Sequence, residues 1–431
     1  MSQSPTPAQP GEPVLSDQVQ WRNSLVFLLN TSLSYLVAPV FYIGVLHAAI
    51  LDRLEASRTV ANLPETVYQW VMPLPVLISW LWPSPRLLRP MLMTALGLLA
   101  AAGLFLASMF YWAPREWLVI GIIVHAAVVG VTNGVRQMCL WELLGRGLSP
   151  ERRAWTLGFT FGLGPIFAVL GSLASQLVLS GNFLDVVQWK PVPSPWSYML
   201  LFGATGPAML LAAGLVLLAQ VPPAPEPRAD GRMADIAQGL RAYFLHPLIL
   251  ITAAAFLLTH AGPMVMTNLA LFVRDALGED PERYAGLQLA LRFSCKAVVG
   301  FGLGWLVARV NARASLFVTT LVSLLGVVWA MVVPGRWYML SFGFLGAGEL
   351  FYIYYLNYII GCAPPERLRE TTAYTNLIAG LAGFIGLLFG LVGDRYGLQT
   401  SFSLAVGLFL AALVLVTRLP PQPRLAGPPS P

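Results

Sequence analysis

The chain has 431 residues, of which 57% are hydrophobic and only 11% are Asp, Glu, Lys or Arg. Soluble globular domains carry about 25% charged residues, so the composition excludes an ordinary soluble protein and indicates a membrane protein. The net charge of +6 is spread without any basic run, which argues against nucleic-acid binding. The spacing of the three cysteines, Cys139, Cys295 and Cys362, gives neither a disulfide framework nor a metal site.

Two polar tails enclose the apolar part of the chain. Residues 1–20 are rich in Pro, Gln and Ser and contain no apolar run, so we expect no cleavable signal peptide. Residues 420–431 form a second, Pro-rich tail. We expect both tails to be disordered.

Between the tails lies a series of apolar segments. They are long enough to cross a bilayer as helices, which takes about 20 residues. We predict twelve helices, over residues 24–47, 66–83, 91–112, 117–140, 155–180, 197–220, 247–273, 284–308, 314–334, 336–361, 372–392 and 400–418. A linker over 221–246 begins Pro-rich and continues as a short amphipathic stretch. We therefore predict an all-α integral membrane protein with six-helix bundles over 21–220 and 247–419.

The distribution of positive charge predicts the orientation. The side that holds the termini carries 15 of the 26 Lys and Arg residues and the other side carries 8, while Arg136, Arg292 and Lys296 lie within helices. Lys and Arg accumulate on the cytoplasmic side of membrane proteins. We therefore expect both termini in the cytoplasm, an even number of helices, and a location in the inner or plasma membrane.

The two halves resemble each other. Pro150-Glu151-Arg152 follows the fourth predicted helix, and Pro365-Glu366-Arg367 follows the tenth, 215 residues later. Gly171 and Gly386 match at the same offset. Because these matches fall at corresponding places in two six-helix sets, they indicate a parallel internal repeat and pseudo-symmetric bundles.

This organisation resembles the major facilitator superfamily of secondary transporters. That family carries the loop signature Gly-x-x-x-Asp-Arg-x-Gly-Arg-Arg after the second and eighth helices. The second copy here keeps Gly304, Arg309 and Arg313, with Ala308 in place of the acid and Asn311 in place of the second glycine. The first copy, over 79–86, keeps only its basic character, and a related string, Gly390-x-x-x-Asp394-Arg395-x-Gly397, follows helix eleven.

The resemblance implies that Gly304, Arg309 and Arg313 belong to a gating loop. The glycine of the signature permits close helix approach, and its arginines hold the inner ends of helices. Anchoring by the positive-inside rule would also place arginines at these positions, and it stays open as the alternative.

In the family fold, helices one, four, seven and ten face a central cavity, and each of them carries a polar stripe in this chain. The candidate substrate-binding residues are Asn30, Ser34, Tyr35, His125, Thr132, Asn133, Arg136, His260, Thr267, Asn268, Tyr352 and Asn357. Helices three, six, nine and twelve, which face lipid in the family, contain no ionisable residue in their interiors.

Several of these candidates have structural alternatives. His125 and His260 could be hydrogen-bonded packing residues, and we expect His47 and His246, at helix ends, to be structural. Arg136 either receives an anionic group of the substrate, pairs with an acid such as Glu142, or extends to the lipid headgroups.

Glu349 is the one charge in the apolar stretch 341–360. A charged side chain at the centre of a bilayer costs at least about 2.5 to 3.5 kcal/mol, so a partner is expected. Arg292 and Lys296 lie one turn apart on helix eight, at a depth similar to that of Glu349. We predict that the three form a proton-coupling site, with a purely structural ion pair as the alternative.

The sequence contains no HExxH, GxSxG, Walker or CxxC motif, so we expect neither an enzyme nor a cofactor. We predict a monomeric secondary active transporter that moves a small polar solute, such as a sugar, nucleoside or organic anion, by alternating access with a proton as coupling ion. The alternatives are an exporter of amphipathic drugs, a lipid flippase, and a receptor or scaffold that does not transport.

Overall fold

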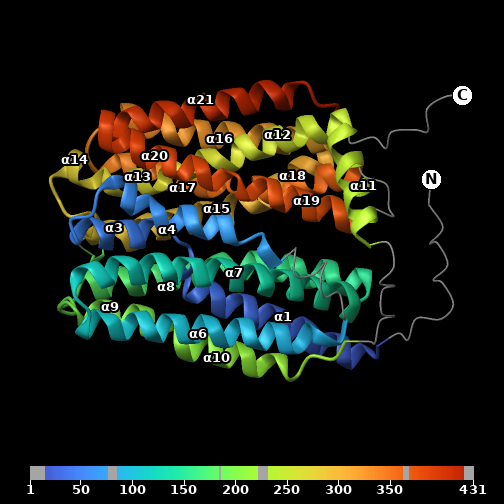
Figure 1. Cartoon of the computed structure of the whole chain (residues 1–431), viewed down its shortest axis with the longest axis horizontal. Coiled ribbons are helices and arrows are strands. Elements are labelled where there is room, and N and C mark those ends of the chain that lie inside the picture. The colour runs from blue at the N-terminus through green and yellow to red at the C-terminus, as the bar shows by residue number, and fades with distance from the viewer. Residues whose placement is uncertain (1–14, 76–84, 184–185, 222–231, 363–367, 422–431) are drawn as a thin grey trace, which may run out of the picture.

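The computed structural model describes residues 15–75, 85–183, 186–221, 232–362 and 368–421. Its helices run roughly along one axis in two groups, the first half of the chain in blue to green and the second half in yellow to red (Figure 1). Helices α1 and α21 have their outer chain ends at the same end of the molecule, where α11 also lies. We call this the α11 end and the opposite one the far end.

The first half consists of helices and one short β-ribbon. Its helices are α1 (Asp17–Leu36), α2 (Ala38–Phe41), α3 (Val45–Arg53), α4 (Arg58–Val71), η1 (Pro85–Leu87), α6 (Leu88–Trp112), α7 (Arg115–Gly147), α8 (Pro150–Ser180), α9 (Trp196–Gly203) and α10 (Thr205–Val216). The ribbon between α8 and α9 pairs β1 (Asn182–Phe183) with β2 (Val187–Gln188) antiparallel.

The second half is also helical. After the linker helix α11 (Arg232–Leu245), its elements are α12 (Pro247–Ala261), η2 (Gly262–Val265), α13 (Met266–Leu271), α14 (Val273–Leu277), η3 (Pro281–Tyr284), α15 (Ala285–Arg309), α16 (Ala312–Val332), η4 (Gly335–Met339), α17 (Leu340–Gly348), α18 (Phe351–Cys362), α19 (Leu368–Gly380), α20 (Ala382–Tyr396) and α21 (Leu398–Thr417). Helix α11 matches the amphipathic stretch of the predicted linker.

The structure confirms an all-α membrane fold. Within the described residues, nine helices are long and apolar enough to cross a bilayer. They correspond to nine of the predicted spans. The predicted first, second and eighth spans correspond instead to α1–α3, α4 and α15, which carry more polar residues. These more polar helices are the ones that supply much of the site described below.

The predicted boundaries of the first two helices were wrong. Helix α1 begins at Asp17, inside the predicted tail, and α4 begins at Arg58 rather than at residue 66. In each case a serine caps the helix: the Ser16 and Ser57 hydroxyls accept hydrogen bonds from backbone N–H groups of the first turn. Such caps stabilise a helix start even where the first turns are polar.

The matched positions of the internal repeat are only partly described. Pro150 begins α8, whereas residues 365–367 lie outside the described part of the chain. Gly171 packs against the backbone of Leu36 in α1, and Gly386 packs against Thr66 in α4. The first copy of the loop signature also falls largely outside the described residues.

Three helices predicted to face the centre are interrupted. The first breaks between α2 and α3, where Gly44 has a φ of 127° that favours glycine. The seventh passes through the 3₁₀ segment η2, which contains Pro263. The tenth breaks between Gly348 and Phe351. Broken helices at membrane depth are typical of transporter binding sites, because they free backbone and side-chain groups there.

The halves pack through α4 against α20 and through α8 against α15. Figure 1 shows α4 and α20 side by side. Glycines let these helices approach closely: a Cβ on Gly383 would lie 2.6 Å from the Trp70 ring, and one on Gly390 would lie 2.7 Å from Cα of Thr59. Small residues on a helix face permit such close packing in membrane proteins.

Ion pairs join the two halves at the far end. Glu282 of η3 accepts from Arg53 of α3 at 2.9 Å and from the Tyr198 hydroxyl of α9 at 2.5 Å. Arg274 of α14 pairs with Asp52 of α3 at 2.9 Å. The halves are therefore closed against each other at this end.

Candidate functional site

A buried cluster of three charged residues lies where α15 meets the break in the tenth helix. Lys296 Nζ lies 3.1 Å from one carboxylate oxygen of Glu349, and the Arg292 guanidinium contacts the other. The side chains of Arg292 and Glu349 are each 10% exposed, and that of Lys296 is 14% exposed. The structure therefore brings Arg292, Lys296 and Glu349 together, as the sequence predicted. We call these three residues the charged triad.

The local sequence explains why the triad forms. Arg292 and Lys296 are one helical turn apart and so share one face of α15. Gly346 lets the tenth helix approach that face, since a Cβ there would lie 2.1 Å from the backbone oxygen of Arg292. Glu349 follows one turn later, at the end of α17, and its carboxylate meets both cations.

An aromatic residue of the first half covers the triad. The Tyr42 ring lies in the break between α2 and α3, 5.2 Å from the Arg292 guanidinium carbon and 5.8 Å from Lys296 Nζ. It also packs edge-on against Phe293 at 4.8 Å. Cation–π contacts of this kind favour positive charge beside the ring. The two halves thus meet at the charged triad.

Glu65 is a second acid at the same interface, which the sequence analysis missed. Its carboxylate accepts a 2.7 Å hydrogen bond from Thr267 of α13, and it interacts electrostatically with Arg292 and Glu349. Glu349 is the acid that the sequence pattern selected for this site, and Glu65 is not among the predicted site residues. The error followed from the predicted start of the second helix at residue 66, whereas the Ser57 cap places Glu65 inside α4.

Arg136 of α7 forms a separate polar cluster within the first half. Its guanidinium donates to the Ser34 hydroxyl at 2.7 Å and to the Asn133 side-chain oxygen at 2.9 Å. The Asn133 amide donates to the Tyr68 hydroxyl at 2.7 Å. We call Ser34, Asn133, Arg136 and Tyr68 the Arg136 cluster.

Two of the alternatives weighed for Arg136 do not hold. Glu142 pairs with Arg146 on its own helix at 2.7 Å, not with Arg136. Arg136 is only 7% exposed and donates to Ser34 of α1, so its side chain does not extend to the headgroups.

Three tyrosines connect the Arg136 cluster to the charged triad. Arg136 lies near Tyr35, Tyr42 and Tyr68. Tyr42 and Tyr68 also lie near Arg292. The ring of Tyr35 stacks on that of Tyr42 at 6.2 Å. The predicted candidates Ser34, Tyr35, Asn133 and Arg136 therefore lie close to the triad, together with two tyrosines that were not predicted.

His260 contacts α4 across the same interface, and the Tyr352 ring lies 6.4 Å from that of His260. His260 Nε2 lies 3.2 Å from the Gln69 side-chain oxygen of α4, and its ring stacks on Phe256 at 5.7 Å. The Tyr352 hydroxyl donates to Asn376 at 2.6 Å. Thr267 contacts the site through Glu65, as described above.

The remaining candidates are not brought to this site. Asn30 donates to the backbone of Ala212 in α10, and the Thr132 hydroxyl bonds within its own helix. His125 stacks on the buried His47 at 5.7 Å inside the first half.

Two asparagines of the second half also point elsewhere. Asn268 holds three helices together, since it donates to Phe389 and Ser401 and accepts from Asn62. Asn357 is exposed on α18. Periodicity placed both on central helices but could not tell which neighbour satisfies each side chain.

Only one of the predicted gating residues can be described in full. Arg313 donates to the backbone oxygens of Leu419 at 2.8 Å and Thr417 at 3.4 Å, and so caps the end of α21. Gly304 and Arg309 lie in α15, but their surroundings are outside the described part of the structure.

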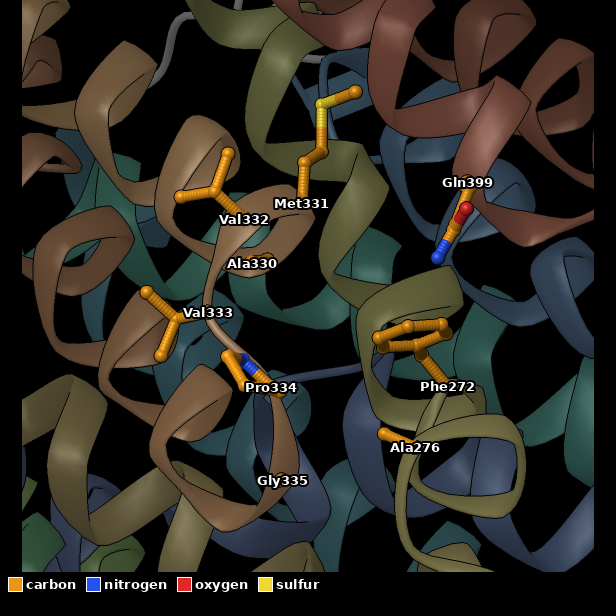
Figure 2. Close-up of a pocket in the computed structure, with 9 residues that line it drawn as sticks. All are labelled: Phe272, Ala276, Ala330, Met331, Val332, Val333, Pro334, Gly335 and Gln399. Atoms are coloured by element: carbon orange, nitrogen blue, oxygen red, sulfur yellow. The ribbon is translucent and has the colours of Figure 1, made fainter.

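A pocket of about 250 Å³ opens near the end of α16, away from the charged residues. Figure 2 shows Phe272 and Gln399 facing the stretch from Val332 to Gly335 across it. Its lining residues are Phe272, Ala276, Ala330, Met331, Val332, Val333, Pro334, Gly335 and Gln399. None of these is charged, so the pocket does not share the chemistry of the charged triad.

The model of the Major Facilitator Superfamily matches residues 23–386. The chain belongs to this superfamily. It is therefore a multi-pass membrane transporter that acts on a small molecule, and not an enzyme. A search of curated protein sequences found no match.

Solved structures give the same fold. The nucleoside transporter NupG aligns with a TM-score of 0.61 at 13% identity, over 93% of this chain and 98% of its own. A D-xylose–proton symporter aligns with a TM-score of 0.65 at 16% identity, over 94% and 97%. The fucose–proton symporter of E. coli aligns with a TM-score of 0.59 at 15% identity, over 93% and 98%. At these identities the likeness extends to the fold alone.

Proposed function

We propose that the protein is a proton-coupled secondary transporter that moves a small polar organic solute by alternating access. The observation that carries the proposal is the buried charged triad, which lies between the two halves and is contacted by Tyr42 of the first half. Charges inside a membrane protein are costly and mark ion or substrate pathways. The proton coupling of the xylose and fucose symporters supports the choice of ion.

The solute would bind between the halves, in contact with the tyrosines that link the Arg136 cluster to the charged triad. The α11 end would face the cytoplasm, in keeping with the distribution of Lys and Arg. The far-end ion pairs then belong to the conformation that is closed to the outside. The transporter would work as a monomer.

Proton binding would act through the balance of charge around Arg292. Glu349 forms ion pairs with two cations in the structure. A proton on Glu349 removes both ion pairs and leaves Arg292 and Lys296 without their counter-charge. Arg292 also interacts with Glu65 of the first half. Loss of the negative charge on Glu349 therefore strengthens the attraction between Arg292 and Glu65, and so between the halves. Proton uptake would in this way favour one arrangement of the halves over the other.

The test is Glu349→Gln in purified, reconstituted protein, with the solute found by thermal-shift screening of a metabolite library. A pH gradient should drive accumulation of that solute by the wild type. The variant should lose this accumulation and keep solute exchange. Glu142→Gln is the matched control, because it removes an acid that pairs with Arg146 on α7 and not with the charged triad. Full pH-driven accumulation by Glu349→Gln would disprove the coupling role.

A further inference from the structure

We propose that the transported solute carries an anionic group, a carboxylate or a phosphate, and that Arg136 receives it. This inference rests on the proposed transport function. It goes further by assigning the chemical class of the solute and the side chain that recognises it.

Arg136 is a buried cation without an acidic partner. Among the described residues no Asp or Glu forms an ion pair with it, and its hydrogen-bond acceptors, Ser34 and Asn133, are neutral. The arginine lies about 16 Å along α7 from the helix end at Gly147. A buried charge without a counter-charge is unfavourable, so the site is suited to a ligand that supplies one.

The guanidinium also has donors to spare. It carries five N–H groups. Three of them serve the bonds from Nε and Nη2 to Asn133 and from Nη1 to Ser34. One N–H on each Nη remains, and two such donors suit the paired oxygens of a carboxylate or phosphate. The bonds to Ser34 and Asn133 hold the guanidinium in place for this contact.

The charge of the surrounding site favours an anion as well. Three cations (Arg136, Arg292 and Lys296) stand against two acids (Glu65 and Glu349). With both acids ionised one positive charge remains, and a proton on either acid raises the excess to two. An anionic solute would balance this excess. Its binding would then be favoured when a proton binds, as uptake with protons requires.

The experiment compares paired solutes that share a carbon skeleton, of which one member carries an anionic group and the other is neutral. The probes are glucose and glucuronate, glycerol and glycerol 3-phosphate, and benzamide and benzoate. Dioleoyl phosphatidylglycerol is included because a lipid headgroup offers the same phosphate chemistry. The readout is the shift in melting temperature of the purified full-length protein. We expect at least one anionic probe to stabilise the wild type and its neutral partner to have no effect.

Variants assign the effect to Arg136. Arg136→Gln should lose the stabilisation by the anion, and Arg136→Lys should keep a weakened one, because lysine retains the charge without the paired donors. Arg146→Gln, on the same helix, should respond like the wild type. In the absence of ligand, Arg136→Gln should melt at the same or a higher temperature, since it removes an unpaired buried charge. A merely structural arginine would give a lower melting temperature instead.

The outcomes separate this inference from the proposed function. Stabilisation that depends on Arg136 supports anion recognition, and the probe that produces it tells a soluble anion from a lipid. Stabilisation by neutral probes alone, or by an anion equally in Arg136→Gln, would overturn the inference and leave transport standing. No stabilisation by any probe, in protein that melts cooperatively, would count against both.

Discussion

Glu65 and Glu349 lie in different halves of the chain, yet both interact with Arg292. Glu349 is held by two cations, whereas the direct contact of Glu65 is the hydroxyl of Thr267. A change in charge at Glu65 therefore breaks no ion pair. It alters the charge that an incoming solute meets.

We predict that Glu65→Gln weakens the pH dependence of solute binding. Glutamine can still accept the hydrogen bond from Thr267, but it is neutral at every pH. An anionic solute should bind the wild type more tightly in mildly acid than in mildly alkaline solution, and the variant should show a smaller difference, because only Glu349 can then take up a proton. Titration calorimetry at the two pH values measures this difference. Glu279→Gln, in an exposed pair with Arg283, is the control, and an unchanged pH dependence in Glu65→Gln would contradict the role.

Glu349→Gln should also lower stability. Removing one partner of a buried ion pair costs about 3–5 kcal/mol because it leaves the other charge uncompensated. The double variant with Lys296→Met should recover part of this loss, since it removes one of the two cations. Melting temperatures in detergent provide the comparison. Glu142→Gln, which breaks a helical i,i+4 pair, should cost only about 0.3–0.5 kcal/mol.

Among single residues, the sequence predicted the members of the charged triad, because they lie at similar depths along their helices. It did not predict Tyr42, Glu65 or Tyr68. Tyr42 lies in a helix break, and Glu65 lies before residue 66, where the predicted second helix began. Asn30 lies away from the triad, where its amide donates to a backbone oxygen of α10, and no periodicity reveals such a partner.

Among the helices, the start of α4 is capped by a residue of the other half of the chain, Asp394 of α20. Asp394 accepts hydrogen bonds from the backbone N–H groups of Arg58 at 2.8 Å and Thr59 at 2.9 Å. It also accepts from the Thr59 hydroxyl at 2.5 Å. The first N–H groups of a helix have no partner within it, so the end of α20 supplies what the start of α4 lacks.

Asp394→Ala should therefore loosen the far end. Loss of a helix cap costs about 0.5–2 kcal/mol, which raises the open fraction by about two- to thirty-fold. The reporter is Thr66→Cys, a fully buried position on α4, in a background without the three native cysteines. Its labelling by a membrane-impermeant maleimide added from the far side should accelerate by that factor. Equal labelling rates with and without Asp394→Ala would show that the cap does not help to close this end.

The positions of most helices could be predicted because long apolar segments dominate the sequence. The break in the tenth helix could not, because it replaces an ordinary backbone bond with the weak one from Leu350 to Ala347 at 3.4 Å. That change depends on the packing of Gly346 against α15. The sequence feature that accompanies the break is a glycine-rich stretch before Glu349. Such a stretch is equally compatible with an unbroken helix.

For the whole molecule, alternating access requires the far-end contacts between the halves to separate in each cycle. Arg53 and Glu282 join the halves there. A disulfide between Arg53→Cys and Glu282→Cys should abolish transport, and reduction should restore it. The matched control is the pair Arg115→Cys and Glu55→Cys, which replaces an ion pair of the same length within the first half. Transport that continues through a fully formed 53–282 disulfide would contradict this account of the cycle.

The central claim is that an anionic solute and a proton cross together through the site around Glu349. Proteoliposomes that contain a pH-sensitive dye test it most directly, with the stabilising solute added outside and no pH gradient imposed. We predict that the lumen acidifies in the wild type, and that Glu349→Gln exchanges labelled solute without any pH change. A wild type that moves solute without protons, or a Glu349→Gln protein that acidifies the lumen at the wild-type rate, would contradict the claim.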